Sequence, residues 1–343
     1  MTQRQSNFEL LRIICMWGVL TNHVLQTLYQ LHISNFSVAG EFRIGLMNCS
    51  IIAVNCFVLI SGYFRIRPSW SGFYNLYTQC AFYAVGFALL AYSLHEGSWT
   101  QILKSGFALS ESPLWFVRTY IGLYLLAPLL NTALDYASKS QQMKSLIFLG
   151  IIDVYLGYMH QIEEIGINGY NLIHFICLYY AGAVIANSPP PAKQYRYGLI
   201  WAVIVLSMTL LHAIKMVFPP IAIVYSLRYN SPFVLLASVV FFKWVTTWKI
   251  QSQVINWISA SVFSIYLIHC NSFVWDRLMT FLKGVQDNYY AWQVAIIIPI
   301  TMLLFYTICI GLDKIRIVIC TPIVKKLTLY STDLQMRIKM LLR

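Results

Sequence analysis

Two side chains in the first apolar run of the chain are suited to act together. Arg12 and His23 are eleven residues apart, which in an α-helix means three turns plus about 20° and about 16 Å of rise, so they share one helix face. Ionisable groups inside apolar helices are costly, which makes both candidates for function. A guanidinium can bind a phosphate, and an imidazole titrates near neutrality and suits a general base. The alternative is that Arg12 extends to the membrane interface and His23 makes a polar contact between helices.

Neighbouring polar residues could support this pair. Glu9 stands three residues before Arg12, a spacing that allows an ion pair on one helix, and an ordinary interfacial ion pair explains it as well as a catalytic role does. Asn22, beside His23, could hydrogen-bond the imidazole or an acceptor molecule. These residues are therefore supporting candidates.

Two arginines follow the second apolar run. Arg65 and Arg67 precede a proline, Pro68, and the forked guanidinium group is suited to binding phosphate. Two arginines in a short inside loop are also what the positive-inside rule predicts without any ligand. The sequence leaves both interpretations open.

Three more residues are candidates with weaker support. Trp115 fits an interfacial aromatic belt as well as a site. Arg118 lies about a turn inside the predicted outer face and needs an acidic partner such as Glu111, Glu163 or Glu164. His269 lies at about the same predicted depth as His23, in a run of the same direction. Asp153 and His174 are expected to make polar contacts between helices.

The composition shows which elements must position these side chains. Of the 343 residues, 59% are apolar and 10% charged, with a mean hydropathy of +0.64, too little polar surface for a soluble globule. Apolar runs of about 17 to 22 residues recur, the length that crosses a bilayer. We predict an all-α integral membrane protein, a bundle of about ten transmembrane helices near residues 10–31, 45–64, 73–94, 114–134, 144–159, 171–187, 197–214, 231–248, 255–275 and 292–312.

The basic residues predict the orientation. With both termini cytoplasmic, 17 of the 24 Lys and Arg residues fall inside and 7 outside, in agreement with the positive-inside rule. Residues 313–343 alternate basic and apolar groups, as expected of an amphipathic cytoplasmic tail on membrane lipid. The dispersed charge argues against nucleic-acid binding. The eight cysteines show no metal-ligand spacing, so we expect no metal.

Four segments together resemble the bacterial integral-membrane acyltransferase-3 family. They are Asn7–Arg12 followed by His23, Phe57–Phe64, Leu114–Pro128 and Ser264–His269. The resemblance covers essentially the whole chain and implies a single transmembrane acyltransferase domain, residues 1–343, in the bacterial inner (cytoplasmic) membrane.

The resemblance also implies an activity. It predicts transfer of an acyl group, acetyl by family frequency, from acyl-CoA (acetyl-CoA) to a sugar hydroxyl of a cell-surface polysaccharide or a lipid-linked precursor. Arg12 and His23 are then essential, and arginines after the second run contact the CoA. The family often separates those two arginines by two residues, whereas Arg65 and Arg67 are separated by one, which leaves open which of them binds the donor.

Two other classes of protein remain as alternatives. One is a transporter or flippase for an anionic or lipid-linked sugar, although no internal repeat of the inverted kind is visible in the sequence. The other is a different membrane acyltransferase superfamily that relies on a membrane histidine, against which the spacing of Arg12 and His23 argues. Direct transfer and an acyl-enzyme intermediate are both compatible with the sequence.

Overall fold

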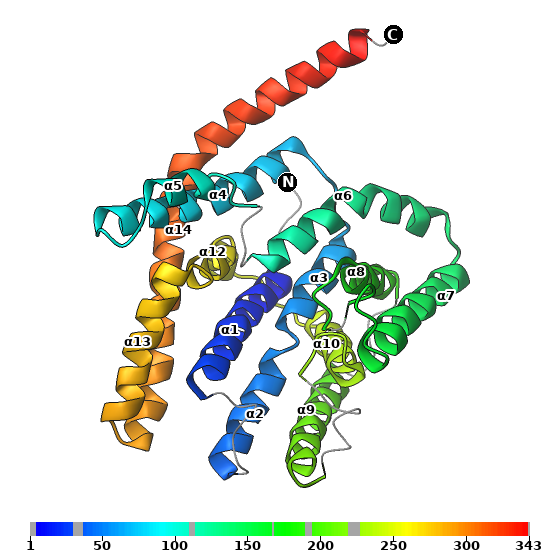
Figure 1. Cartoon of the computed structure of the whole chain (residues 1–343). Helices are drawn as coiled ribbons and strands as arrows, with labels where there is room; N and C mark the ends of the chain where they lie inside the picture. The colour runs from blue at the N-terminus through cyan, green and yellow to red at the C-terminus, as the bar shows by residue number, and fades with distance from the viewer. Residues whose placement is uncertain are drawn as a thin grey trace. The chain divides into compact units, whose positions relative to one another are not determined.

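The protein is helical throughout the residues that the structure describes. A computed structural model describes residues 5–29, 37–109, 114–166, 168–188, 194–218 and 227–341, and these contain no strand. The elements in chain order (Figure 1) are α1 (Ser6–Tyr29), α2 (Val38–Ser50), α3 (Ala53–Phe64), α4 (Trp70–Ser93), α5 (Trp99–Ser105), α6 (Trp115–Tyr136), α7 (Lys139–Gly150), the π-helix η1 (Ile151–Met159), α8 (Leu172–Ala186), α9 (Gln194–Val217), α10 (Pro232–Val245), α11 (Gln253–Ser259), α12 (Val262–His269), α13 (Ser272–Asn288) and α14 (Ala291–Leu341).

The chain divides into two compact units. The first comprises Met1–Ile66 and Thr119–Ala260, and the second comprises Arg67–Arg118 and Ser261–Arg343. In the first unit α3 packs against α8, α1 packs against α2, α3 and α11, and α9 packs against α2 and α10. In the second unit α4 packs against α5, α12 and α14, and α13 packs against α12 and α14.

Within the described residues, several helices are long and apolar enough to cross a membrane. Five meet this description, or six if the bent pair Gln253–His269 and Ser272–Asn288 forms one span. Two further apolar helices, Leu172–Ala186 and Pro232–Val245, are shorter. The protein is thus an all-helical, multi-pass membrane protein. The ten crossings and the cytoplasmic location of both termini stay predictions.

The ninth predicted run, 255–275, is not one continuous helix. The chain bends by 84° at the break that follows His269, between α12 and α13. The side-chain oxygen of Asn271 accepts a hydrogen bond of 3.1 Å from the backbone N–H of Phe273 and caps α13. Asparagine favours this capping position over a helix interior, so it ends one helix and begins the next.

The last helix is longer than predicted. Residues 313–341, expected as a separate tail, continue α14 in one helix of 51 residues (Figure 1). The tail begins with a buried ion pair, because Arg316 donates two hydrogen bonds of 2.9 Å to Asp313. Tyr83 of α4 donates a third bond of 2.9 Å to the same carboxylate. This part of the tail therefore belongs to the packing of the second unit.

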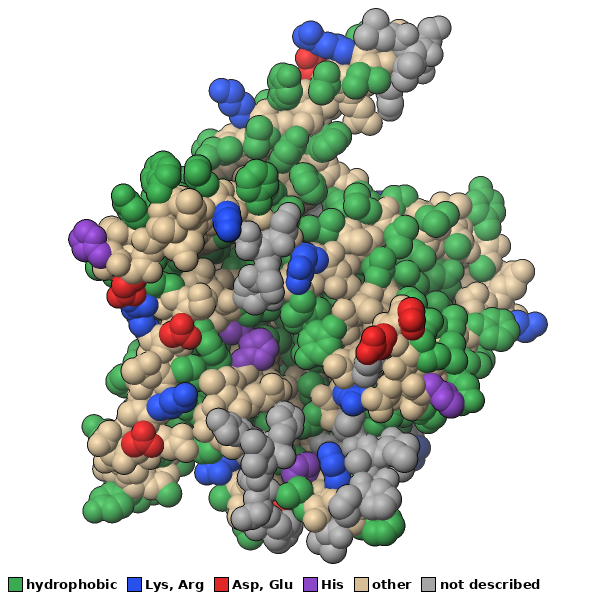
Figure 2. Space-filling model, in the orientation of Figure 1, with side chains coloured by type: hydrophobic (Ala, Val, Ile, Leu, Met, Phe, Trp, Pro, Cys, Tyr) green, Lys and Arg blue, Asp and Glu red, His purple; other side chains and the backbone are tan. Residues whose placement is uncertain are grey.

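Apolar side chains remain at the surface of the long helices. Figure 2 shows many of them on one face of the molecule. On α9 the exposed ones recur every three or four positions, at Leu199, Val203, Leu206, Leu210 and Ile214. Such a stripe is expected where a helix faces lipid.

Glycines allow α3 and α8 to approach closely. A Cβ atom added at Gly62 would lie 2.0 Å from the carbonyl oxygen of Tyr179, and one added at Gly182 would lie 2.3 Å from that of Leu59. Small residues at helix crossings are typical of membrane proteins, where close van der Waals packing stabilises association. This crossing fixes the end of α3. The two arginines of the predicted donor site, Arg65 and Arg67, follow α3 directly in the chain.

Candidate functional site

The N-terminal part of α1 is anchored to the first unit. The side-chain amide of Asn7 donates a hydrogen bond of 3.1 Å to the carbonyl of Val245 at the end of α10. Phe8 is buried, with ring centroids 4.8 Å from Tyr63 of α3 and 5.7 Å from Phe242 of α10. These contacts fix the direction in which Arg12, one turn further on, extends.

Arg12 forms the ion pair predicted from its spacing to Glu9. Its guanidinium lies 2.7 Å from one carboxylate oxygen of Glu9, and the other oxygen accepts a short hydrogen bond from the Ser259 hydroxyl of α11. Glu9 is buried, while 31% of the Arg12 side chain is exposed. The arginine is therefore held on one side and retains N–H groups that can reach a ligand.

Two more helices meet at Arg12. The side chain of Tyr120 on α6 hydrogen-bonds that of Ser61 on α3, and the charge of Arg12 acts on the Tyr120 hydroxyl. In the sequence, Tyr120 lies within the segment Leu114–Pro128 and was not singled out for a role. Its contact with Ser61 and Arg12 had no local signal, since these residues are far apart in the chain.

His23 lies on the same helix as Arg12. Because α1 is continuous from Ser6 to Tyr29, the predicted shared face holds, with about 16 Å of rise between the two residues. His23 is half-buried, and Asn22 is buried and accepts a hydrogen bond of 3.3 Å from Gln26. The Asn22 oxygen thus accepts one hydrogen bond within α1 and can accept a second.

The loop after α3 is held by a closed ring of hydrogen bonds. The backbone N–H of Ile66 donates to the Tyr179 hydroxyl at 3.0 Å, the hydroxyl donates to the Asn131 side chain at 2.7 Å, and Asn131 donates back to the Ile66 carbonyl at 2.9 Å. Ile66 is buried. It stands between Arg65 and Arg67, so the ring fixes the backbone of both arginines.

The two arginines of this loop differ in their surroundings. Arg65 ends α3 with a positive φ of 57° and forms an ion pair with Asp135 of α6. Arg67 is exposed, and in the described part of the chain it has no ion pair. A partly neutralised cation and an unpaired one therefore flank Ile66.

A polar network lies at the centre of the first unit. Nδ1 of His174 is 2.7 Å from the Asp153 carboxylate, and Nε2 is 3.0 Å from the side-chain oxygen of Asn55. The amide nitrogen of Asn55 donates to the Ser238 hydroxyl at 3.1 Å and to the Tyr229 carbonyl at 3.0 Å, which identifies its oxygen as the acceptor. Both ring nitrogens of His174 therefore face side-chain oxygens of other residues. The expected polar contact between helices is confirmed.

The second unit holds the other predicted histidine. His269 ends α12 and is 1% exposed, with Nδ1 2.6 Å from the carbonyl of Ile265. This bond requires a proton on Nδ1, because a carbonyl oxygen can only accept. Nε2 lies 3.7 Å from the sulfur of Cys270. His269 and His23 belong to different units, and their shared depth stays a prediction.

Trp115 and Arg118 occupy the first turn of α6. Trp115 is half-buried against Phe116, with ring centroids 6.0 Å apart, and Phe116 packs 6.1 Å from Tyr266 of α12. Arg118 is exposed, and Glu111, one of its expected partners, lies outside the described residues.

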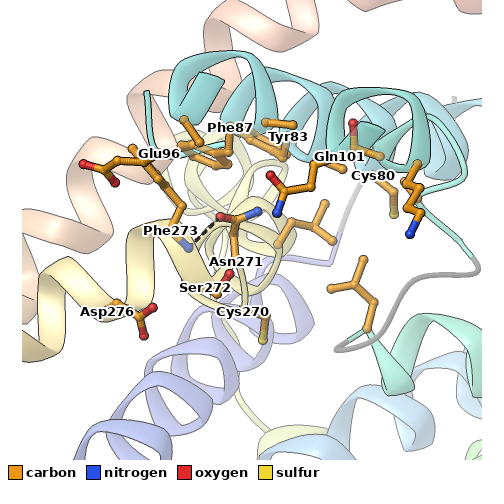
Figure 3. Close-up of a pocket in the computed structure, with 18 of the residues that line it drawn as sticks. Cys80, Tyr83, Phe87, Glu96, Gln101, Cys270, Asn271, Ser272, Phe273 and Asp276 are labelled. Atoms are coloured by element: carbon orange, nitrogen blue, oxygen red, sulfur yellow. Dashed lines mark hydrogen bonds between the residues drawn. The ribbon is translucent and has the colours of Figure 1, made fainter. Parts of the chain in front are cut away.

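A cavity of about 680 Å³ lies in the second unit, between α4, α5 and the break that joins α12 to α13 (Figure 3). Its walls combine aromatic rings with amide and charged groups, among them Tyr83, Phe87, Gln101, Asn271, Phe273 and Asp276. Its volume is in the range of small-molecule sites. Cys270, the neighbour of His269, also lines it.

Comparison with known families decides the class of the protein. The acyltransferase-3 family model, described as an acyltransferase domain, matches residues 5–313. The chain belongs to the acyltransferase-3 family. Neither the curated proteins nor the solved structures offer a match. The part of this acyltransferase that the family model matches includes Arg12, His23, Arg65 and His269.

Proposed function

We propose that this acyltransferase moves an acyl group, with acetyl as the first candidate, from acyl-CoA to a sugar hydroxyl of a cell-surface polysaccharide or its precursor. The observation that carries the proposal is the pair Arg12 and His23 on one face of the continuous helix α1, in a chain of the acyltransferase-3 family. One helix then presents a phosphate-binding cation and a base about 16 Å apart, a separation suited to a long donor with phosphates at one end and a thioester at the other.

The donor is proposed to bind through Arg12, Arg65 and Arg67. Arg12 keeps 31% of its side chain exposed, and Arg67 is exposed without an ion pair among the described residues. The hydrogen-bonded ring around Ile66 holds the loop before a ligand arrives, which reduces the entropy lost on binding. Arg65 contributes less charge, because Asp135 pairs with it.

The chemistry proposed for His23 is general-base catalysis. The imidazole accepts the proton of the sugar hydroxyl while the hydroxyl oxygen attacks the thioester carbonyl carbon. The C–S bond then breaks, and the imidazolium returns its proton to the CoA sulfur. General-base catalysis typically contributes 10² to 10⁴ in rate, and positioning supplies the rest.

The proposed setting is the bacterial inner membrane, with both termini in the cytoplasm. In this topology acyl-CoA arrives from the cytoplasmic side, and the segment 95–113 lies outside, where a surface glycan is reached. The inside excess of Lys and Arg supports this orientation.

The proposal is tested with purified protein in lipid vesicles that receive acetyl-CoA labelled in the acetyl group and the glycan fraction of producing cells. We expect free CoA thiol and labelled glycan to appear in equal amounts. Succinyl-CoA and longer acyl-CoA donors, compared in the same assay, define the acyl group. Movement of sugar across the vesicle membrane without release of CoA would instead indicate a transporter.

A further inference from the structure

The cavity of the second unit carries two side-chain amides whose orientation is fixed. The oxygen of Gln101 accepts a hydrogen bond of 2.8 Å from the backbone N–H of Ser98 and caps α5. The oxygen of Asn271 caps α13 in the same way, through the N–H of Phe273. Each amide therefore turns its NH₂ group away from the capped backbone, and both residues line the cavity (Figure 3).

These NH₂ groups are available to a ligand. Among the described residues neither has a hydrogen-bond partner, so Gln101 and Asn271 together offer donors to acceptor oxygens in the cavity. A ligand that lacks such oxygens would leave the donors unpaired when it displaces water.

The charges around the cavity balance. Among the described residues that line the cavity, Glu96 and Arg277 form an ion pair with each other, and the remaining charged side chains are one of each sign, Lys104 and Asp276. The cavity therefore offers no net field that favours an anion such as the phosphates of CoA, and equally none that favours a cation. An uncharged ligand fits best.

One wall of the cavity is aromatic. Tyr83 and Phe87 stack with ring centroids 6.3 Å apart. Tyr83 is buried and its hydroxyl donates to Asp313, so the half-buried Phe87 is the ring of this pair that a ligand can contact. A sugar in its pyranose form has C–H groups on its faces and oxygens around its edge. It can contact an aromatic face while its edge oxygens accept from Gln101 and Asn271.

We infer that this cavity binds an uncharged pyranose ring of the acceptor glycan, with the sugar face on Phe87 and the edge oxygens on the amides of Gln101 and Asn271. The inference rests on the proposed function for the identity of the acceptor as a sugar. To the proposed function the inference adds where the sugar binds, that the bound sugar ring is uncharged, and which residues select it.

The chain offers a matched control for Gln101. Gln141 caps α7 through an identical pair of bonds, since its oxygen accepts from Ser138 N–H at 2.8 Å and its own N–H donates to the Ser138 hydroxyl at 3.3 Å, as in the Ser98 cap. Gln141 does not line the cavity. Gln101→Ala and Gln141→Ala therefore lose the same cap, and only the first loses a donor to the cavity.

The first measurement is steady-state transfer from labelled acetyl-CoA to the glycan fraction after alkaline removal of its acyl groups. Gln101→Ala should raise the KM for glycan about tenfold, equivalent to about 1.4 kcal/mol, and leave the KM for acetyl-CoA unchanged. Gln141→Ala should change neither. Equal KM values for glycan in the two variants, or a rise confined to acetyl-CoA, would overturn the proposal. A KM for glycan that rises steeply between about 0.05 and 0.5 M salt would overturn the uncharged class of ligand.

The second measurement needs no turnover and so separates this inference from the proposed function. Ser272→Cys places a thiol on the cavity wall, and Thr280→Cys places one on the same helix outside the cavity. The glycan fraction, added without donor, should slow alkylation by N-ethylmaleimide at position 272 and leave position 280 unaffected. The protection should be lost in Gln101→Ala and kept in Gln141→Ala. If the protein transfers acetyl but the glycan gives no protection at position 272, the sugar-binding role of the cavity alone is refuted. If the glycan protects position 272 but the protein transfers nothing, the acyl-transfer proposal alone is refuted.

Discussion

Gly62→Ala should separate α3 from α8 and loosen the loop of the predicted donor site. The new Cβ atom would lie 2.0 Å from the carbonyl oxygen and 2.7 Å from the carbonyl carbon of Tyr179. These are backbone atoms, so no rotamer change relieves the clash. To reach 3.4 Å, the lower limit of ordinary contact, the two backbones must move apart by about 1.4 Å, the difference between these distances.

A movement of this size would break hydrogen bonds and lower the free energy of unfolding. It would stretch the 3.0 Å bond between Ile66 and Tyr179 beyond hydrogen-bonding range. Overpacking typically costs about 1–3 kcal/mol, and two lost hydrogen bonds of the Ile66 ring add about 1 kcal/mol each. The better helix propensity of alanine returns up to about 1 kcal/mol. The net destabilisation is about 2–5 kcal/mol.

The assay compares the thermal unfolding midpoint and the KM for acetyl-CoA of Gly62→Ala with those of Gly86→Ala. Gly86 is also a helical glycine, on α4, and a Cβ added there meets nothing within 4 Å. Gly86→Ala should keep or slightly raise the midpoint and leave the KM unchanged. Gly62→Ala should lower the midpoint and raise the KM. If Gly62→Ala behaved as Gly86→Ala does, the close crossing and its role in the loop would be refuted.

Three further predictions concern the first unit and its loop. Tyr179→Phe removes the hydroxyl from the Ile66 ring and keeps the aromatic packing, so kinetics should show a several-fold higher KM for acetyl-CoA with kcat nearly unchanged; an unchanged KM would contradict the role of the ring. His174→Leu leaves the Asp153 carboxylate buried without its partner and should destabilise the protein by about 3–5 kcal/mol in thermal unfolding, most of which a second change, Asp153→Leu, should restore. Arg67→Gln should raise the KM for acetyl-CoA more than Arg65→Gln, and the difference should shrink at high salt; the reverse order would assign the donor phosphates to Arg65.

Local patterns in the sequence predicted local structure. The ion pair of Arg12 with Glu9 follows from a spacing of three on one helix, and the shared face of Arg12 and His23 follows from helix periodicity. The break after His269 also had a local signal, since Asn271 and Ser272 are residues that favour helix starts. This signal was obscured because the apolar residues on both sides of Asn271 and Ser272 continue the hydrophobic run.

Contacts between distant segments had no such signal. The Ile66 ring joins three helical segments through Asn131 and Tyr179, which lie 65 and 113 positions further along the chain. The network of Asp153, His174 and Asn55 spans up to 119 positions. Hydropathy identifies polar groups in apolar helices. Which of these groups pair is decided by how the helices pack, and no residue spacing in a single sequence reveals that packing.

The role of His23 as the base of an acyl transfer from acyl-CoA is tested most directly in membranes that contain the protein and receive acetyl-CoA labelled in the acetyl group. The variants to compare are wild type, His23→Ala and His160→Ala, the last an exposed histidine after η1 that serves as control. We expect labelled glycan with wild type and His160→Ala, and a loss of label of at least about 100-fold with His23→Ala. Full transfer by His23→Ala, at equal amounts of protein in the membrane, would contradict this role.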